Sequence, residues 1–172
     1  QDQSEGYAYL RRLLQFLQWQ KRARGEQGDR WLLKTPHHLH YPRTLAKTFP
    51  GARIIQTHRH PVEVIPSYGS MMCALMSPFT DSLDAPAVAA HWAEKWRVGL
   101  ETTMAFREQP SHGVEYLDLQ FSSTLDNLDE TIESVYRFTG DTLTPEARYE
   151  MARWRELNTR ESRPEHHYTL EQ

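Results

Sequence analysis

The segment from Arg53 to Met71 constrains the fold of this 172-residue chain more than any other. It opens with the apolar pair Ile54 and Ile55, which suits a β-strand, and then passes through a polar turn to Pro61. Proline is favoured at the first position of a helix, because its φ is preset and no needed hydrogen bond is lost. The segment therefore predicts a strand, a tight polar loop and a helix. In an open parallel sheet such a loop lies at the carboxyl edge, where ligands bind.

Two side chains of this segment are suited to a phosphate group. Arg59 lies in the loop, and Ser67 follows about two helical turns later. A guanidinium and a hydroxyl beside a helix start can bind an anion through charge-assisted hydrogen bonds and the helix dipole. The alternative is that Arg59 pairs with Glu63 one turn further on, and that Ser67 only occupies the helix surface.

The longer run WLLKTPHHLHYPRTLAKTFPGARIIQTHRHPVEVIPSY, residues 31–68, carries several motifs in order. It has a Lys-Ser/Thr-Pro-x-His-Leu element, a Phe-Pro-x-Ala-Arg sequence before the strand and a Thr-His-Arg-x-Pro turn. The run resembles sulfotransferases that use 3'-phosphoadenosine-5'-phosphosulfate (PAPS), in particular their bacterial-type branch, and the resemblance covers most of residues 31–172. It implies that Arg59 and Ser67 hold the 3'-phosphate of PAPS. It also implies sulfonate transfer to a hydroxyl or amine of a small molecule, glycan or peptide.

Sulfonate transfer needs a base for the acceptor and positive charge near the transferring group. The resemblance assigns the base to His38, in preference to its neighbour His37, and histidine is the usual base near neutral pH. Lys34 would offset charge on the sulfonate group. The alternatives are a surface or helix-capping histidine and a lysine at the edge of a sheet that reaches solvent.

The composition excludes several other classes of protein. Residues 1–60 hold 11 Lys and Arg against 4 Asp and Glu, whereas residues 61–172 hold 9 against 19. The basic first third fits an anionic ligand or a solvated basic helix face, and no dense basic run with aromatic residues indicates nucleic-acid binding. A single cysteine, Cys73, excludes an intramolecular disulfide. Without an apolar run of membrane-spanning length or a signal peptide, a cytoplasmic protein is expected.

Histidines and acidic residues are also candidate metal ligands. His58 and His60 lack the spacing and the cysteine partners of a structural zinc site, so no metal is expected. A kinase-like phosphotransferase would need a carboxylate for Mg²⁺ after a strand, and Asp118 is the only one so placed. The family strand at Asp118 normally ends in Tyr, where this chain has Phe121. The alternatives to a sulfotransferase are a non-catalytic nucleoside-phosphate-binding module and a kinase-like fragment.

Strands and helices alternate along the sequence. Strands are predicted at Trp31–Thr35, Arg53–Thr57 and Val114–Leu119, and helices at about residues 5–24, 39–49, 61–75, 86–108, 125–138 and 145–157. This order predicts one α/β domain over residues 1–172 with a mostly parallel sheet flanked by helices. The resemblance implies a P-loop-like fold of three layers.

PAPS-dependent enzymes begin with a strand and a Gly/Ser/Thr-rich loop whose backbone amides bind the 5'-phosphosulfate, and this sequence contains no such loop. We therefore expect a truncated domain, incomplete at its N-terminus and inactive alone. Its sheet would have an unpaired edge that favours a homo-oligomer.

Overall fold

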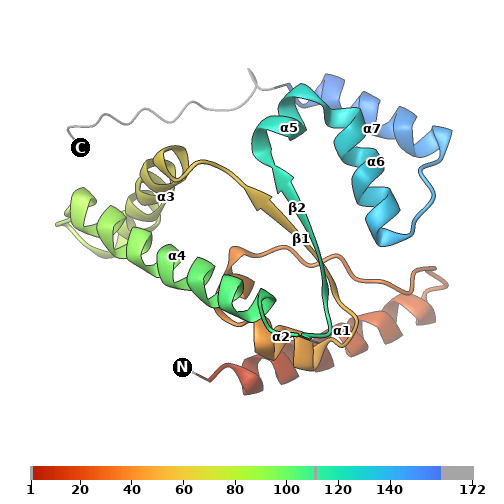
Figure 1. The fold of residues 1–172 in the computed structure, drawn as a ribbon, viewed down its shortest axis with the longest axis horizontal. Coiled ribbons are helices and arrows are strands. Elements are labelled where there is room, and N and C mark those ends of the chain that lie inside the picture. Colours follow the sequence, from red (N-terminus) through yellow and green to blue (C-terminus); the bar gives the residue numbers. More distant parts are fainter. Residues whose placement is uncertain (1, 111, 160–172) are drawn as a thin grey trace. The chain divides into compact units, whose positions relative to one another are not determined.

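A computed structural model describes residues 2–110 and 112–159 and shows an α/β structure composed mostly of helices (Figure 1). The chain divides into two compact units. The first comprises Gln1–Ala52 and Lys95–Glu115, and the second comprises Arg53–Glu94 and Tyr116–Gln172. The long helix α4, Ala85–Arg107, contributes residues to both.

The first unit contains α1 (Ser4–Ala23), the 3₁₀ turn η1 (Pro36–His40), α2 (Pro42–Thr48) and the second half of α4. Its buried apolar side chains come from all three α-helices and the segment after α4: Tyr7, Leu14, Leu45, Phe106 and Val114. The predicted helix over residues 5–24 is confirmed. It ends before Gly25, whose φ of 76° is easily adopted only without a side chain.

The segment between His38 and Phe49 forms two elements where the sequence predicted one helix face. The hydroxyl of Thr35 accepts a hydrogen bond from the His37 N–H and starts η1. The turn stops at Tyr41, because the next residue, Pro42, has no N–H to continue it. Pro42 instead becomes the first residue of α2.

The predicted strand at Trp31–Thr35 is wrong. The segment has no regular structure, and Leu32 is 90% exposed. A strand is held by hydrogen bonds to a neighbouring strand, and residues 31–35 pair with none in the part of the chain that the structure describes. Lys34 therefore lies in an irregular, exposed segment and not at the end of a strand.

The second unit contains the sheet. Strands β1 (Arg53–His58) and β2 (Glu115–Gln120) pair in parallel, and they confirm two of the three predicted strands (Figure 1). The helices of this unit are α3 (Pro61–Met76), α5 (Phe121–Asp126), α6 (Leu128–Thr139), α7 (Pro145–Leu157) and the first half of α4, with a 3₁₀ turn η2 (Ser77–Phe79) after α3. The α/β class is thus confirmed, while the three-layer arrangement stays a prediction.

Helix ends in the second unit follow the local sequence. Gly140 ends α6 in the left-handed conformation, as its position in the sequence predicted, and the Thr144 hydroxyl caps α7 by accepting from the Ala147 N–H at 3.2 Å. Helix α3 packs closely on α4. A Cβ at the buried Gly69 would lie 3.0 Å from the Cβ of Ala89.

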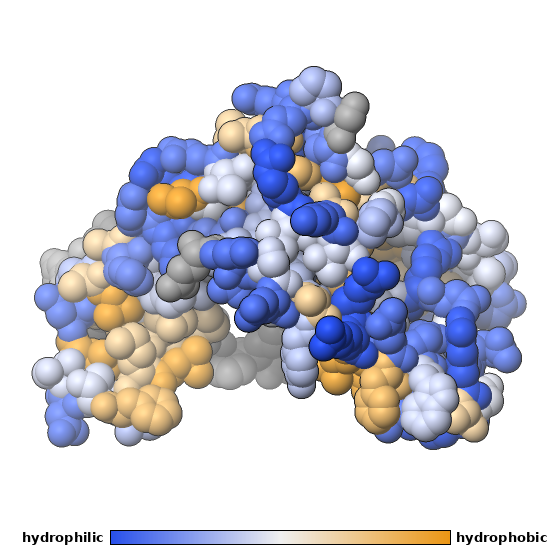
Figure 2. Space-filling view, turned by 90° about the horizontal axis from the view of Figure 1, so that it is seen from below, coloured by the Kyte–Doolittle hydropathy of each residue, from blue (hydrophilic) through white to orange (hydrophobic). Residues whose placement is uncertain are grey.

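Apolar side chains also reach the surface of the molecule, where Figure 2 shows them as orange patches among hydrophilic residues. Leu32 in the first unit and Phe79 in the second are 90% and 88% exposed. Within the described residues, no helix combines the length and the apolar character needed to cross a membrane.

Candidate functional site

The strand–loop–helix transition predicted around Arg59 is confirmed. Strand β1 ends at His58, and α3 begins at Pro61. The imidazole of His60 accepts a hydrogen bond from the Val62 N–H at 3.3 Å and caps the helix. Arg59 is therefore held in a two-residue loop beside a helix start, where an anion is favoured.

The guanidinium of Arg59 contacts two side chains of its own unit. Its Nε donates a hydrogen bond to Glu63 Oε2 at 2.6 Å, and its central carbon lies 4.8 Å from the ring centroid of Phe121. The Glu63 pair is the alternative that the sequence left open. An exposed pair at this helical spacing stabilises by only about 0.3–0.5 kcal/mol, so Glu63 is a weak partner for Arg59.

Ser67 is half-buried in the second turn of α3. Its hydroxyl makes no hydrogen bond to any residue that the structure describes. It is thus available to a ligand, and the convergence of Arg59 and Ser67 on one phosphate stays a prediction.

A histidine–aspartate pair joins the two strands of the sheet. His58 Nε2 lies 2.7 Å from Asp118 Oδ1, and both side chains are partly exposed. Sequence reasoning considered each residue separately as a metal ligand and missed the pair, because sixty residues separate them and only strand pairing brings them together. The contact gives the Asp118 carboxylate a structural partner other than Mg²⁺.

In the first unit, His38 has a buried partner that sequence reasoning also missed. The hydroxyl of Tyr7 lies 2.7 Å from His38 Nδ1, and Tyr7 is 5% exposed. The sequence offers one indication of such a contact. Tyr7 lies among the apolar residues of α1, and a buried tyrosine hydroxyl usually finds a hydrogen-bond partner. The partner could not be predicted, since His38 lies 31 residues further along the chain.

Burial sets the protonation of this pair. It raises the pKa of Tyr7 to about 12, so the phenol keeps its proton. Burial, with a smaller contribution from His37, lowers the pKa of His38. At neutral pH His38 is therefore largely uncharged, which is the form that a general base requires.

The backbone around His38 is fixed by α4. The buried Thr103 hydroxyl donates to the Leu39 carbonyl at 2.8 Å. The ring of His40 packs on the same helix, so closely that a Cβ at Gly99 would lie 2.8 Å from it. His37, in contrast, is exposed; its N–H donates to Thr35, and its ring lies 5.0 Å from the ring of Tyr41. These contacts favour His38 over His37 as the residue with a defined geometry.

A model of the sulfotransferase family matches residues 1–145 of the chain. The chain belongs to the sulfotransferase family. The match includes α1, which precedes the motif-bearing run, and it ends where α7 begins. No curated protein and no solved structure matches the chain.

The predicted site residues of this sulfotransferase fall into two pairs. Lys34 and His38 belong to the first unit, and Arg59 and Ser67 belong to the second. A shared cleft for the two pairs stays a prediction. Among residues 2–110 and 112–159, no group of three His, Cys, Asp or Glu side chains could hold a metal ion.

Proposed function

We propose that this sulfotransferase transfers a sulfonate group from PAPS to a hydroxyl or amine of an acceptor. The observation that carries the proposal is the β1–loop–α3 transition, which holds Arg59 beside a helix start in a chain of this family. In this proposal β1 and β2 are two strands of a larger P-loop-like parallel sheet. Arg59 and Ser67 bind the 3'-phosphate of the donor.

The reaction is an in-line displacement at sulfur. The acceptor oxygen or nitrogen attacks the sulfur of PAPS, and the bond from sulfur to the bridging phosphate oxygen breaks. Adenosine 3',5'-bisphosphate leaves with the electron pair of that bond, and His38 takes the acceptor proton. Lys34 offsets the charge on the sulfonate group. Positioning and electrostatics supply most of the rate enhancement, because the donor is already activated.

The contact with Tyr7 defines how His38 can act. If Nδ1 accepts the phenol proton, Nε2 carries hydrogen and cannot take another proton. His38 therefore acts as a base through Nε2 in the tautomer whose Nδ1–H donates to the Tyr7 oxygen. Tyr7 is in this role a positioning residue, whose hydroxyl oxygen lies 2.7 Å from His38 Nδ1 and orients the imidazole.

Calorimetric titration with adenosine 3',5'-bisphosphate, combined with a sulfonate-transfer assay, tests the proposal. We expect weak binding and no turnover from the 172-residue chain, and tighter binding with turnover from a chain extended at its N-terminus by a phosphosulfate loop. Binding without turnover in both would indicate a nucleoside-phosphate-binding module. Absence of binding in both would refute the proposal.

A further inference from the structure

A hollow of about 400 Å³ lies between α1 and α2 in the first unit. Its lining from α1 includes Ala8, Arg11 and Arg12, which lie on one face of the helix because they are three and four residues apart. From α2 it includes Thr44 and Lys47. Ala8 ends at its Cβ, so the longer side chains around it enclose space that a ligand could occupy.

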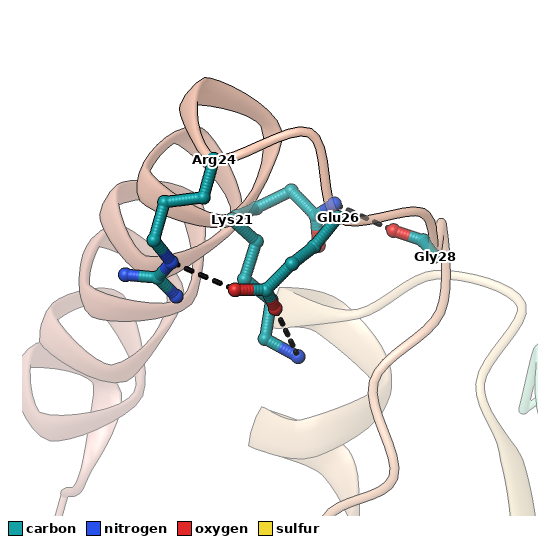
Figure 3. Close-up of polar contacts among 5 residues, drawn as sticks. Lys21, Arg24, Glu26 and Gly28 are labelled. Carbon is teal, nitrogen blue, oxygen red and sulfur yellow. Dashed lines mark hydrogen bonds and ion pairs between the residues drawn. The ribbon is translucent and has the colours of Figure 1, made fainter.

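The cations at the C-terminal end of α1 are neutralised by neighbouring acids. Glu26 accepts a hydrogen bond from Arg24 Nε at 2.7 Å and pairs with Lys21 Nζ at 4.0 Å (Figure 3). Arg22 pairs with Asp29 at 2.9 Å. Two carboxylates thus offset most of the three positive charges at this end of the helix, which weakens its attraction for an anion.

The cations of the hollow are not neutralised in this way. Arg11, Arg12 and Lys47 form no ion pair with any carboxylate of the described residues, and none of the residues lining the hollow is acidic. Three positive charges around one concave surface attract anions more strongly than the same charges spread over a convex one. The hollow thus concentrates part of the positive charge of residues 1–60.

Hydroxyl groups lie among these cations. Ser4, Thr44 and Thr48 line the hollow. The Thr48 hydroxyl donates to the Thr44 carbonyl, and the Ser4 hydroxyl donates to Asp2. Hydrogen bonds from Ser4 lower the pKa of the Asp2 carboxyl, and attraction to Lys47 adds to the effect. Asp2 is therefore the acidic group that opposes an anion here.

We infer that this hollow is a binding site for a small molecule that carries two or more sulfate or phosphate groups. Guanidinium groups bind such tetrahedral oxyanions through two parallel hydrogen bonds. A volume of about 400 Å³ suits a small organic ligand rather than a single inorganic ion. The inference stands apart from sulfonate transfer, because none of the residues lining the hollow has a role in the proposed reaction.

Calorimetric titration of the 172-residue chain with sucrose octasulfate, at about physiological ionic strength, tests the inference. Arg12→Gln and Lys47→Gln should each weaken binding about tenfold, since each removes a charge-assisted hydrogen bond. Arg22→Gln is the matched control. It removes the same charge from the same helix outside the hollow, and it should change the affinity by less than about twofold, as expected for an exposed and screened charge.

A second variant tests the shape of the site independently of its charge. Ala8→Met changes no charge, and methionine is also a good helix former, but its side chain fills the hollow. The substitution should therefore weaken binding by about as much as the loss of one cation. Circular dichroism establishes that the variant keeps its helices. If Ala8→Met binds like the unchanged chain, or if Arg22→Gln is as damaging as Arg12→Gln, the attraction is to net charge and the inference is wrong.

Adenosine 3',5'-bisphosphate, titrated in parallel, distinguishes a phosphate ester from a sulfated sugar as the ligand. If Arg12→Gln but not Arg59→Ala weakens the binding of one of the two probes, the result supports a binding site in the hollow, and the probe affected indicates the ligand class. Loss of the nucleotide only in Arg59→Ala assigns that ligand to the other unit. Failure of both probes to bind would overturn the inference.

Discussion

The two units of this chain hold their candidate functional side chains in opposite ways. In the first unit, His38 is half-buried and hydrogen-bonded to Tyr7, beside a core of apolar side chains. In the second unit, Arg59 is exposed in the loop before α3, and its partners among the described residues are Glu63 of that helix and the ring of Phe121.

This difference corresponds to two kinds of chemistry. A general base needs a tuned pKa, and burial provides it by disfavouring the charged imidazole. A phosphate ligand needs a cation that it can reach, and an exposed guanidinium with a weak partner provides one. The predictions below test whether each unit depends on the environment in which its residue lies.

The largest expected effect is that of His38→Ala. In an N-terminally extended chain it should lower turnover about 10²–10⁴-fold, the usual contribution of a positioned acid or base, and leave nucleotide affinity nearly unchanged. Steady-state kinetics and calorimetry measure the two quantities. His37→Ala is the control, and a larger loss from it would reverse the assignment.

Removal of Arg59 should have a smaller effect on binding. Arg59→Ala is expected to weaken the binding of adenosine 3',5'-bisphosphate about 10- to 100-fold, because it removes a charge-assisted hydrogen bond of about 1.5–3 kcal/mol. Ser67→Ala should weaken it less, since its hydroxyl is neutral. Arg97→Ala, which removes another arginine in an exposed helical pair, provides the control. Equal losses from Arg97→Ala and Arg59→Ala would contradict a specific phosphate site.

Tyr7→Phe tests whether the first unit depends on its buried hydrogen bond. The variant keeps the ring but removes the hydroxyl, so the free energy of unfolding should fall by about 1 kcal/mol. Denaturant titration measures this change. Tyr9→Phe, on the exposed face of the same helix, should leave stability unchanged. A stable Tyr7→Phe chain with an unchanged His38 titration would refute the positioning role.

The stability of the first unit should depend on pH through His38. The pKa of His38 is lowered in the folded chain, so below the ordinary value of about 6.5 the unfolded chain binds more protons. The contribution of His38 to stability is therefore present above that pH and is lost as the pH falls through the lowered value. His38→Gln should therefore flatten the acid side of the stability profile. Thermal unfolding of the unchanged chain and of His38→Gln at pH values between about 4 and 8, on both sides of the ordinary histidine pKa, measures this change.

The smallest effect is expected from Glu63→Gln. The exposed pair with Arg59 contributes only about 0.3–0.5 kcal/mol, so releasing it should tighten nucleotide binding about twofold. Loss of carboxylate repulsion acts in the same direction. Glu101→Gln, which disrupts the equivalent pair with Arg97, is the control. Weaker nucleotide binding by Glu63→Gln would mean that Glu63 orients Arg59 for the ligand.

The sequence predicted those features that depend on neighbouring residues. The loop at Arg59 and the helix end at Gly140 follow from proline and glycine chemistry, and both are confirmed. The strand at Trp31–Thr35 was wrong, because a strand needs a partner that an apolar run cannot show. The contacts of His38 with Tyr7 and of His58 with Asp118 could not be predicted, since each joins residues that only the tertiary fold brings together.

The close approach of Gly69 to Ala89 has a mechanical consequence for the Arg59 site. A methyl group at Gly69 would lie 3.0 Å from the Cβ of Ala89 and 3.4 Å from its Cα, so a side chain there would require a shift of a few tenths of an ångström between α3 and α4. Ser67 lies half a turn before this contact on the same rigid helix, and the displacement would move its hydroxyl. Sites of this kind tolerate misplacements of only about 0.5 Å. Gly69 therefore sets the spacing between α3 and α4, because only a residue without a side chain fits here without displacing its neighbour.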